Sequence, residues 1–161
     1  MSKHPTPSAP TPDWQSYLCK VNDELASVYV DLGFAGSAPI SETSKLGWLW
    51  IRLNHPREDG LSSDEEFDAL CDFEDELEGT LRKHKPSYYV GRITTQGRRE
   101  FYFYVTNAME LKEAVNDLLE IHSEYSFQLG EKEDELWRHY FKTLLPGAGG
   151  MEQINKRGSK K

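Results

Sequence analysis

The chain has 161 residues, of which 27 are acidic and 19 are lysine or arginine, so its formal net charge is -8. Hydrophobic residues make up 37% and aromatic residues 12%, which is sufficient for a core in a domain of this length without disulfides or metals. The 12 glycines are too few for collagen-like order, and no run of about 18 apolar residues could span a membrane. The acidic balance disfavours nucleic acid and anionic membranes as partners.

Proline, glycine and charge divide the chain into three parts. Residues 1–12 contain four prolines among small residues, which predicts a disordered leader. Residues 13–146 are predicted to form a single α+β domain, and residues 147–161 a flexible basic tail. The N-terminus lacks the apolar stretch of a secretory signal, and only two cysteines occur, so we expect a cytoplasmic protein with free thiols.

The ordered part begins with two strand-like segments, residues 15–20 and 24–33. Asn22-Asp23 lies between them and favours the tight turn of a β-hairpin. After a loop, residues 47–53 alternate with a period of two, which predicts a strand with an aliphatic and an aromatic face. The aliphatic face comprises Leu49, Ile51 and Leu53, and the other comprises Trp48, Trp50 and Arg52.

A helix is predicted from Ser62 or Ser63 to about Lys83. Either serine can cap it, because Glu65 and Glu66 lie three residues further on, in the register of a capping box. The stripe of this helix that faces the core is predicted to comprise Phe67, Leu70, Cys71, Leu77 and Leu81.

The second half of the chain predicts another hairpin, residues 88–95 and 98–106, joined at Gln96-Gly97. Asn107 can cap the next helix, whose apolar residues recur at helical spacing. A short strand over residues 125–129 follows. A last helix is predicted over residues 132–145, with Leu136, Trp137, Tyr140, Phe141 and Leu144 on one side.

From residue 47 onward the order is strand, helix, strand, strand, helix, strand. This order predicts an α+β fold with a ferredoxin-like βαββαβ core and an antiparallel sheet. A β-hairpin precedes the core and a C-terminal helix follows it. The two core helices of such a fold cover one face of the sheet, so the aliphatic face should meet them and the aromatic face should point away.

The first predicted helix is strongly acidic, because residues 62–81 carry nine carboxylates and no lysine or arginine. A solvated face whose first-turn acids are favoured by the helix dipole is one interpretation. The other is a contact surface for a basic partner, such as a protein that otherwise binds nucleic acid. The candidate interaction residues are Asp64, Glu65, Asp68, Asp72, Asp75 and Glu76.

Glu74 shares the apolar stripe of the same helix, and an ionised carboxylate there needs a cationic partner. Arg92 and Arg99 on the second hairpin are donors of the right type. A structural ion pair is one interpretation. The alternative is a ligand-binding or enzymatic pocket formed by Glu74, Arg92, Arg99 and Glu100.

The segment 98–105 resembles the aromatic central strand of RNA-recognition domains. It lacks the glycines of that motif, and a central strand packed on both faces also needs consecutive aromatic residues. If this face is open, single-stranded nucleic acid could stack on Trp48, Trp50, Tyr102 and Tyr104.

The sequence contains none of the common phosphate-binding, nucleophile-elbow or zinc-protease motifs. Its five histidines are scattered over predicted turns, termini and helix ends. We therefore infer no catalytic residue, no cofactor and no metal site, and we favour a protein that is not an enzyme.

Several separated blocks resemble a bacterial family of unknown function, the family numbered 695. These blocks are residues 60–66, 73–75, 89–95 and 97–104, and Trp137 with Tyr140. The likeness spans about residues 14 to 146, and it implies no catalytic residue because the family has no established activity. The acidic α/β character and the block 137–141 are also similar to regulators that bind and inhibit ribonuclease E, although those lack the basic tail and the N-terminal hairpin.

Taken together, the acidic helix and the missing catalytic motifs predict a cytoplasmic protein-interaction or regulatory module. The partner is expected to be a protein with a basic surface, and the likeness to the ribonuclease regulators implies a ribonuclease.

Overall fold

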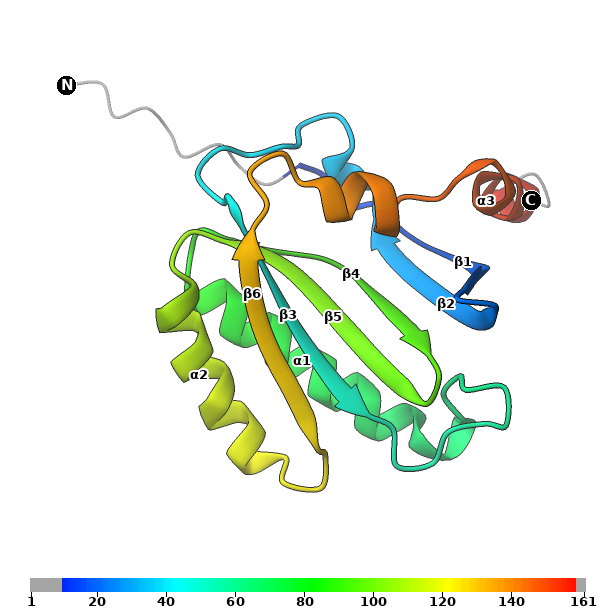
Figure 1. The fold of residues 1–161 in the computed structure, drawn as a ribbon, viewed down its shortest axis with the longest axis horizontal. Coiled ribbons are helices and arrows are strands. Elements are labelled where there is room, and N and C mark those ends of the chain that lie inside the picture. The colour runs from blue at the N-terminus through cyan, green and yellow to red at the C-terminus, as the bar shows by residue number, and fades with distance from the viewer. Residues whose placement is uncertain (1–9, 159–161) are drawn as a thin grey trace.

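The computed structural model describes residues 10–158 (Figure 1), so most of the predicted leader lies outside the described residues. An antiparallel sheet of six strands forms the core, in the order β1-β2-β4-β5-β3-β6. The strands are β1 (Trp14–Val21), β2 (Glu24–Asp31), β3 (Lys45–Arg52), β4 (Ser87–Thr95), β5 (Arg98–Val105) and β6 (Phe127–Glu133). The helices are α1 (Phe67–Lys83), α2 (Ala108–Ile121) and α3 (Ala148–Gly158).

The predicted α+β class is confirmed, as are the N-terminal hairpin and the presence of a C-terminal helix. From β3 to β6 the elements follow the predicted order of strand, helix, strand, strand, helix, strand. The ferredoxin-like designation itself stays a prediction. Asn107 caps α2 as expected, because its side-chain oxygen accepts a hydrogen bond from the Glu110 amide at 3.1 Å.

Both hairpins turn where the sequence places the turn residues. Asn22 and Asp23 have φ values of 53° and 66°, and Gln96 and Gly97 have φ values of 53° and 76°. Positive φ at both central residues defines a type I′ turn, whose twist matches that of the flanking strands. The local sequence therefore sets the register of β1 with β2 and of β4 with β5.

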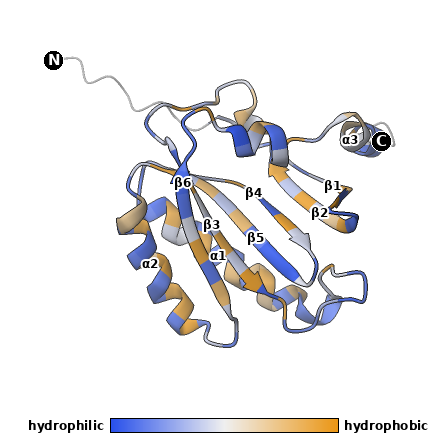
Figure 2. Cartoon of the chain, viewed as in Figure 1, coloured by the Kyte–Doolittle hydropathy of each residue, from blue (hydrophilic) through white to orange (hydrophobic). Residues whose placement is uncertain are grey.

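One face of the sheet packs against α1 and α2, which lie side by side behind it in Figure 1. Leu49, Ile51 and Leu53 turn to these helices, as predicted. In both helices hydrophilic residues alternate with hydrophobic ones (Figure 2), as expected of helices with one face in water. An apolar stripe on each helix is sufficient for packing on the sheet, because the backbone amides and carbonyls of a helix form hydrogen bonds with each other.

The start of α1 differs from the prediction in two respects. Phe67 is 62% exposed and Cys71 is exposed, while Phe73 is fully buried. The expected stripe was wrong at Phe67 because the α-helix begins only there, after the 3-10 turn Asp64–Glu66. It was wrong at Cys71 because the buried stripe runs through Leu70, Phe73, Glu74, Leu77 and Leu81, to one side of that residue.

The capping box is also wrong. Glu66 is buried and accepts hydrogen bonds from the amides of Asn54 and His55, at 3.0 and 2.8 Å. Ser63 makes no side-chain cap and donates instead to the His55 carbonyl at 2.6 Å. Glu66 therefore fixes the loop before the helix and not the helix amide that a capping box would bond.

The second face of the sheet is covered in part by the segment 134–145, which we call the C-terminal cover. The helix predicted over 132–145 is wrong, because β6 continues to Glu133 and only a short π-helical turn, Tyr140–Leu144, follows. Trp137 interrupts any longer helix with a φ of 54°. Trp137, Tyr140 and Leu144 are buried as expected, whereas Leu136 and Phe141 are exposed.

Residues 148–158 form α3, so the predicted flexible tail is wrong over this range. The helix lies beside the outer edge of β1 (Figure 1). Gln153 pairs with the backbone of Leu18, donating to its carbonyl and accepting from its amide, both at 2.9 Å. Gly150 lies against Tyr17, where an added Cβ would come within 2.9 Å of the ring. This contact explains why glycine occupies the third position of the helix.

Candidate functional site

The acidic surface of α1 is exposed at all six predicted positions: Asp64, Glu65, Asp68, Asp72, Asp75 and Glu76. Glu65 lies 3.9 Å from the His55 ring nitrogen, and Glu76 contacts His122. Within residues 10–158 no ion pair reaches the four aspartates. Their mutual repulsion is therefore balanced only by solvent and by the dipole at the start of the helix.

Phe67 is the apolar centre of this surface. Its ring is 62% exposed, and it follows directly on the acids of the 3-10 turn. The exposed thiol of Cys71 lies one helical turn further on. An exposed phenylalanine surrounded by carboxylates is the composition of an anchor with a polar rim, as found at protein interfaces.

Glu74 and Arg92 form an ion pair under α1. The carboxylate is 8% exposed, and the Arg92 guanidinium also lies 4.5 Å from the centre of the Tyr29 ring. The Trp14 ring stacks on the Tyr29 ring, with the two ring centroids 4.7 Å apart. Arg92 is therefore held by charge on one side and by an aromatic face on the other.

Arg99 is buried beside this pair, with 8% exposure. It donates to the hydroxyls of Thr94 and Ser62, at 3.0 and 3.1 Å. Burial and, secondly, the charge of Arg92 lower the pKa of Arg99 to about 10, and Glu74 opposes both effects. Arg99 thus remains a cation at neutral pH, with hydroxyl partners in place of a carboxylate.

Glu100 lies on the opposite face of the sheet from Glu74, so the four residues of the predicted pocket are not brought together. The alternation of side chains along β5 separates Arg99 from Glu100, a feature that the period of two already implied. Glu100 is 5% exposed and accepts hydrogen bonds from the Tyr102 hydroxyl and from Arg98 Nε, both at 2.6 Å. It neutralises Arg98 and cannot act on Glu74.

The predicted aromatic face is divided between buried and half-buried residues. Tyr104 is fully buried under Trp137, with ring centroids 4.0 Å apart and planes 6° apart. Tyr102 is 4% exposed, and its ring centroid lies 4.1 Å from that of His139. The two tyrosines are therefore closed to stacking with nucleobases. Trp48 and Trp50 are half-buried, and Trp48 lies over Gly130, where a Cβ would clash with its ring at 2.3 Å.

Sequence reasoning missed the residues that fix the C-terminal cover. The Asp134 carboxylate accepts from the amides of Arg138 and His139, at 2.8 and 3.0 Å, and from the Tyr104 hydroxyl at 2.7 Å. Burial alone would raise the pKa of Asp134, but these hydrogen bonds outweigh it and lower the pKa. The sequence signal for this arrangement was Asp134 itself, because an aspartate placed just before a helical turn commonly accepts hydrogen bonds from the first amides of that turn.

His139 is held in its neutral form. Burial lowers its pKa to about 4, with a further contribution from Lys132. Its Nε2, like Nε1 of Trp50 and the hydroxyl of Tyr89, is buried without a hydrogen-bond partner in the described part of the chain.

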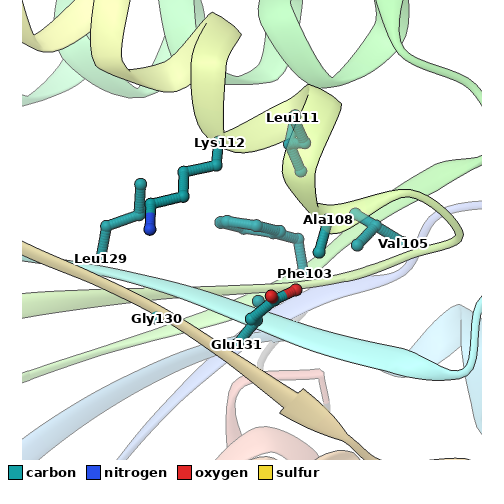
Figure 3. Close-up of a pocket in the computed structure, with 9 residues that line it drawn as sticks. Phe103, Val105, Ala108, Leu111, Lys112, Leu129, Gly130 and Glu131 are labelled. Carbon is teal, nitrogen blue, oxygen red and sulfur yellow. The ribbon is translucent and has the colours of Figure 1, made fainter.

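Two hollows border both β3 and β6. A cavity of about 30 Å³ lies between α2 and β6, lined mainly by Phe103, Leu111 and Leu129 (Figure 3). It offers space for little more than one water molecule, so it is a packing gap. A larger hollow of about 290 Å³ lies where β3 ends and β5 and β6 begin. Among residues 10–158 no group of three metal-ligating side chains occurs, and no helix has the length and apolarity to cross a bilayer.

The fold and these surfaces define a small α+β sheet protein with two helices on one face and an irregular cover on the other. The chain belongs to the family of unknown function DUF695, whose family model matches residues 12–145. No curated protein and no solved structure gives a significant match. The similarity to regulators of ribonuclease E is not among these findings and stays a prediction.

Proposed function

We propose that the protein is a cytoplasmic, non-enzymatic interaction module that binds a basic protein through the outward face of α1. The observation that carries this proposal is the exposed ring of Phe67 among aspartates that form no ion pair within the described residues. A ribonuclease with a basic surface has the required chemistry.

The two components of this surface have different roles in binding. Carboxylates at the rim steer a cationic partner and exclude acidic ones, and they act mainly on the association rate. A buried aromatic side chain at the centre contributes most of the affinity, because it is removed from water when the partner covers it. Phe67 and the aspartates of α1 together provide both components.

The proposal is tested by charge reversal on two helices. One variant carries Asp68→Lys, Asp72→Lys and Asp75→Lys on α1, and the matched control carries Glu113→Lys, Asp117→Lys and Glu120→Lys on α2. All six residues are exposed. The two variants have the same net charge because each replaces three carboxylates by lysines. We expect proteins captured from a lysate of the source cells to be lost from the α1 variant and kept by the α2 variant.

A third variant, Phe67→Ser, keeps every carboxylate. It should reduce capture by at least about tenfold, as expected for the loss of an interface anchor, and binding of the identified partner should weaken with salt. Equal capture by the α1 and α2 variants would contradict the proposal, since the position of the carboxylates would then be irrelevant.

A further inference from the structure

A polar hollow of about 290 Å³ lies where β3 ends and β5 and β6 begin. These strand ends are at the lower end of the sheet in Figure 1. Its polar lining includes the side chains of Arg52, Gln96, Arg98 and Gln128, and Trp50 borders it. None of the residues that line it is acidic. The hollow is separate from the outward face of α1.

Arg52 and Arg98 lie directly opposite each other across the β3–β5 pair. Like charges in such positions destabilise a sheet, because their side chains stand next to each other on one face. Within the part of the chain that the structure describes, no carboxylate lies within 4.0 Å of a nitrogen of Arg52. Glu100 balances the charge of Arg98, so the pair carries one positive charge, that of Arg52, without a carboxylate partner.

Arg98 is fixed in orientation. Its Nε donates to Glu100 at 2.6 Å, and its guanidinium carbon lies 4.7 Å from the centre of the Trp50 ring. Glu100 is held in turn by the Tyr102 hydroxyl. The Nε contact uses one of the five N–H donors of a guanidinium, so the terminal nitrogens are left to bind an oxyanion with two parallel hydrogen bonds.

We propose that this hollow binds a small molecule through an oxyanion, either a phosphate or a carboxylate, held between Arg52 and Arg98. The amides of Gln96 and Gln128 contact the rest of the ligand. A volume of about 290 Å³ lies at the lower end of the range for small-molecule pockets. The ligand is therefore no larger than a mononucleotide.

The charges around the hollow favour a compact ligand over a nucleic acid. Arg52 also borders another hollow, which Glu24 and Glu58 line together with the ion pair of Arg57 and Asp59. Glu24 and Glu58, together with the net charge of -8, repel a long polyanion. A single oxyanion that reaches only the two arginines avoids them.

Calorimetric titration at low ionic strength tests the proposal with four probes: inorganic phosphate, citrate, adenosine 5′-monophosphate and adenosine. We expect adenosine not to bind. Binding of phosphate and the nucleotide supports a phosphate ligand, and binding of citrate alone supports a carboxylate ligand. If no oxyanion probe binds at millimolar concentration, the proposal is overturned.

Arg52→Gln locates the site, because Arg52 is exposed and has no side-chain partner in the described residues whose loss would disturb the fold. It should weaken oxyanion binding at least about tenfold, the effect of losing a charge-assisted hydrogen bond. Arg52→Lys should keep part of the affinity. Arg82→Gln, which removes an exposed arginine of α1, is the control and should bind like the wild type. Equal binding by Arg52→Gln and Arg82→Gln would overturn the proposal and would leave the proposed α1 surface unaffected.

Discussion

The two faces of the sheet are covered by different means. On one face, two regular helices present apolar side chains to Leu49, Ile51 and their neighbours. On the other, the C-terminal cover has little regular structure, and side chains bond its backbone at residues 138, 139, 140 and 144. The Tyr17 hydroxyl donates to the Leu144 carbonyl of the cover at 2.6 Å. In the other direction, Trp137 Nε1 of the cover donates to the carbonyl of Thr43, in the loop before β3, at 2.9 Å.

The difference follows from how backbone polar groups are satisfied. A helix pairs its own amides and carbonyls, so only shape and apolarity matter on the face that it covers. An irregular segment leaves these groups unpaired, and they must find partners if they are buried. Tyrosine, tryptophan and aspartate supply such partners here, which explains why the second face is aromatic without being a stacking surface for bases.

The largest effect is expected at the centre of the C-terminal cover. Trp137→Ala removes a fully buried ring that stacks on Tyr104, and it should lower the free energy of unfolding by about 3 to 5 kcal/mol. Urea denaturation measures this loss. Leu136→Ala is the control, because that side chain is 55% exposed and its loss should cost less than about 0.5 kcal/mol. Similar costs for the two variants would mean that the segment does not cover the sheet in solution.

The Glu74–Arg92 pair is a polar exception on the helix-covered face. Glu74→Ala should destabilise by about 2 to 3 kcal/mol, less than a fully buried pair because the Arg92 side chain keeps 23% exposure. Glu78→Ala is the matched control one turn later, where the carboxylate pairs with Arg82 at the surface. Thermal unfolding that ranks the two variants equally would contradict the structural role of Glu74.

Tyr104→Phe separates hydrogen bonding from ring packing. The Tyr104 hydroxyl donates to Asp134 and accepts from the Tyr140 amide at 3.2 Å, and its loss leaves both groups without this partner. We expect a cost of about 1 to 3 kcal/mol in chemical denaturation. Tyr88→Phe should be nearly neutral, since no hydrogen bond of the Tyr88 hydroxyl is found within residues 10–158. A neutral Tyr104→Phe would show that packing alone holds the C-terminal cover.

The smallest effect concerns pH, and it has opposite signs at two histidines. The pKa of His139 falls from 6.5 to about 4, so the unfolded chain takes up the proton first, and stability is lost as the pH falls from 6.5 towards 4. Partial burial lowers the pKa of His122, but hydrogen bonds to Glu76 and Glu124 outweigh it and raise the pKa. The stability that His122 adds is present below 6.5 and is lost as the pH rises through the folded pKa.

Melting temperatures measured from below pH 6.5 for His139 to above pH 6.5 for His122 should therefore respond differently to two substitutions. His139→Gln should flatten the loss of stability on acidification, and His122→Gln should steepen it. If both variants changed the slope of melting temperature against pH in the same direction, the environment described for His139 or for His122 would be wrong.

Local signals were sufficient for most of the fold. Asn22-Asp23, Gln96-Gly97 and Asn107 each act on their immediate neighbours, so the two hairpin turns and the start of α2 follow from the sequence. The alternation in β3 likewise identifies the side chains that meet the helices.

The errors arise where a long-range contact overrides a local preference. Glu66 bonds the loop at residues 54 and 55, and Trp137 adopts positive φ in order to stack on Tyr104. The arrangement of Arg52 opposite Arg98 depends on which strand pairs with β3, and single-strand patterns do not contain that information. The exposed position of Phe67 became visible only once the first residue of α1 was known.

The pairing of Gln153 with Leu18 covers part of the edge strand β1, and proteolysis could remove this cover. An uncovered edge strand is a template on which other chains can add, and such addition leads to aggregation. Here a side-chain amide occupies that template, and Arg157 reaches the Ser16 carbonyl next to it. A protease that cuts near Pro146 would detach this protection while leaving the sheet intact. The clipped protein should then be soluble when fresh and should grow into fibres on storage, although every residue of its core is still present.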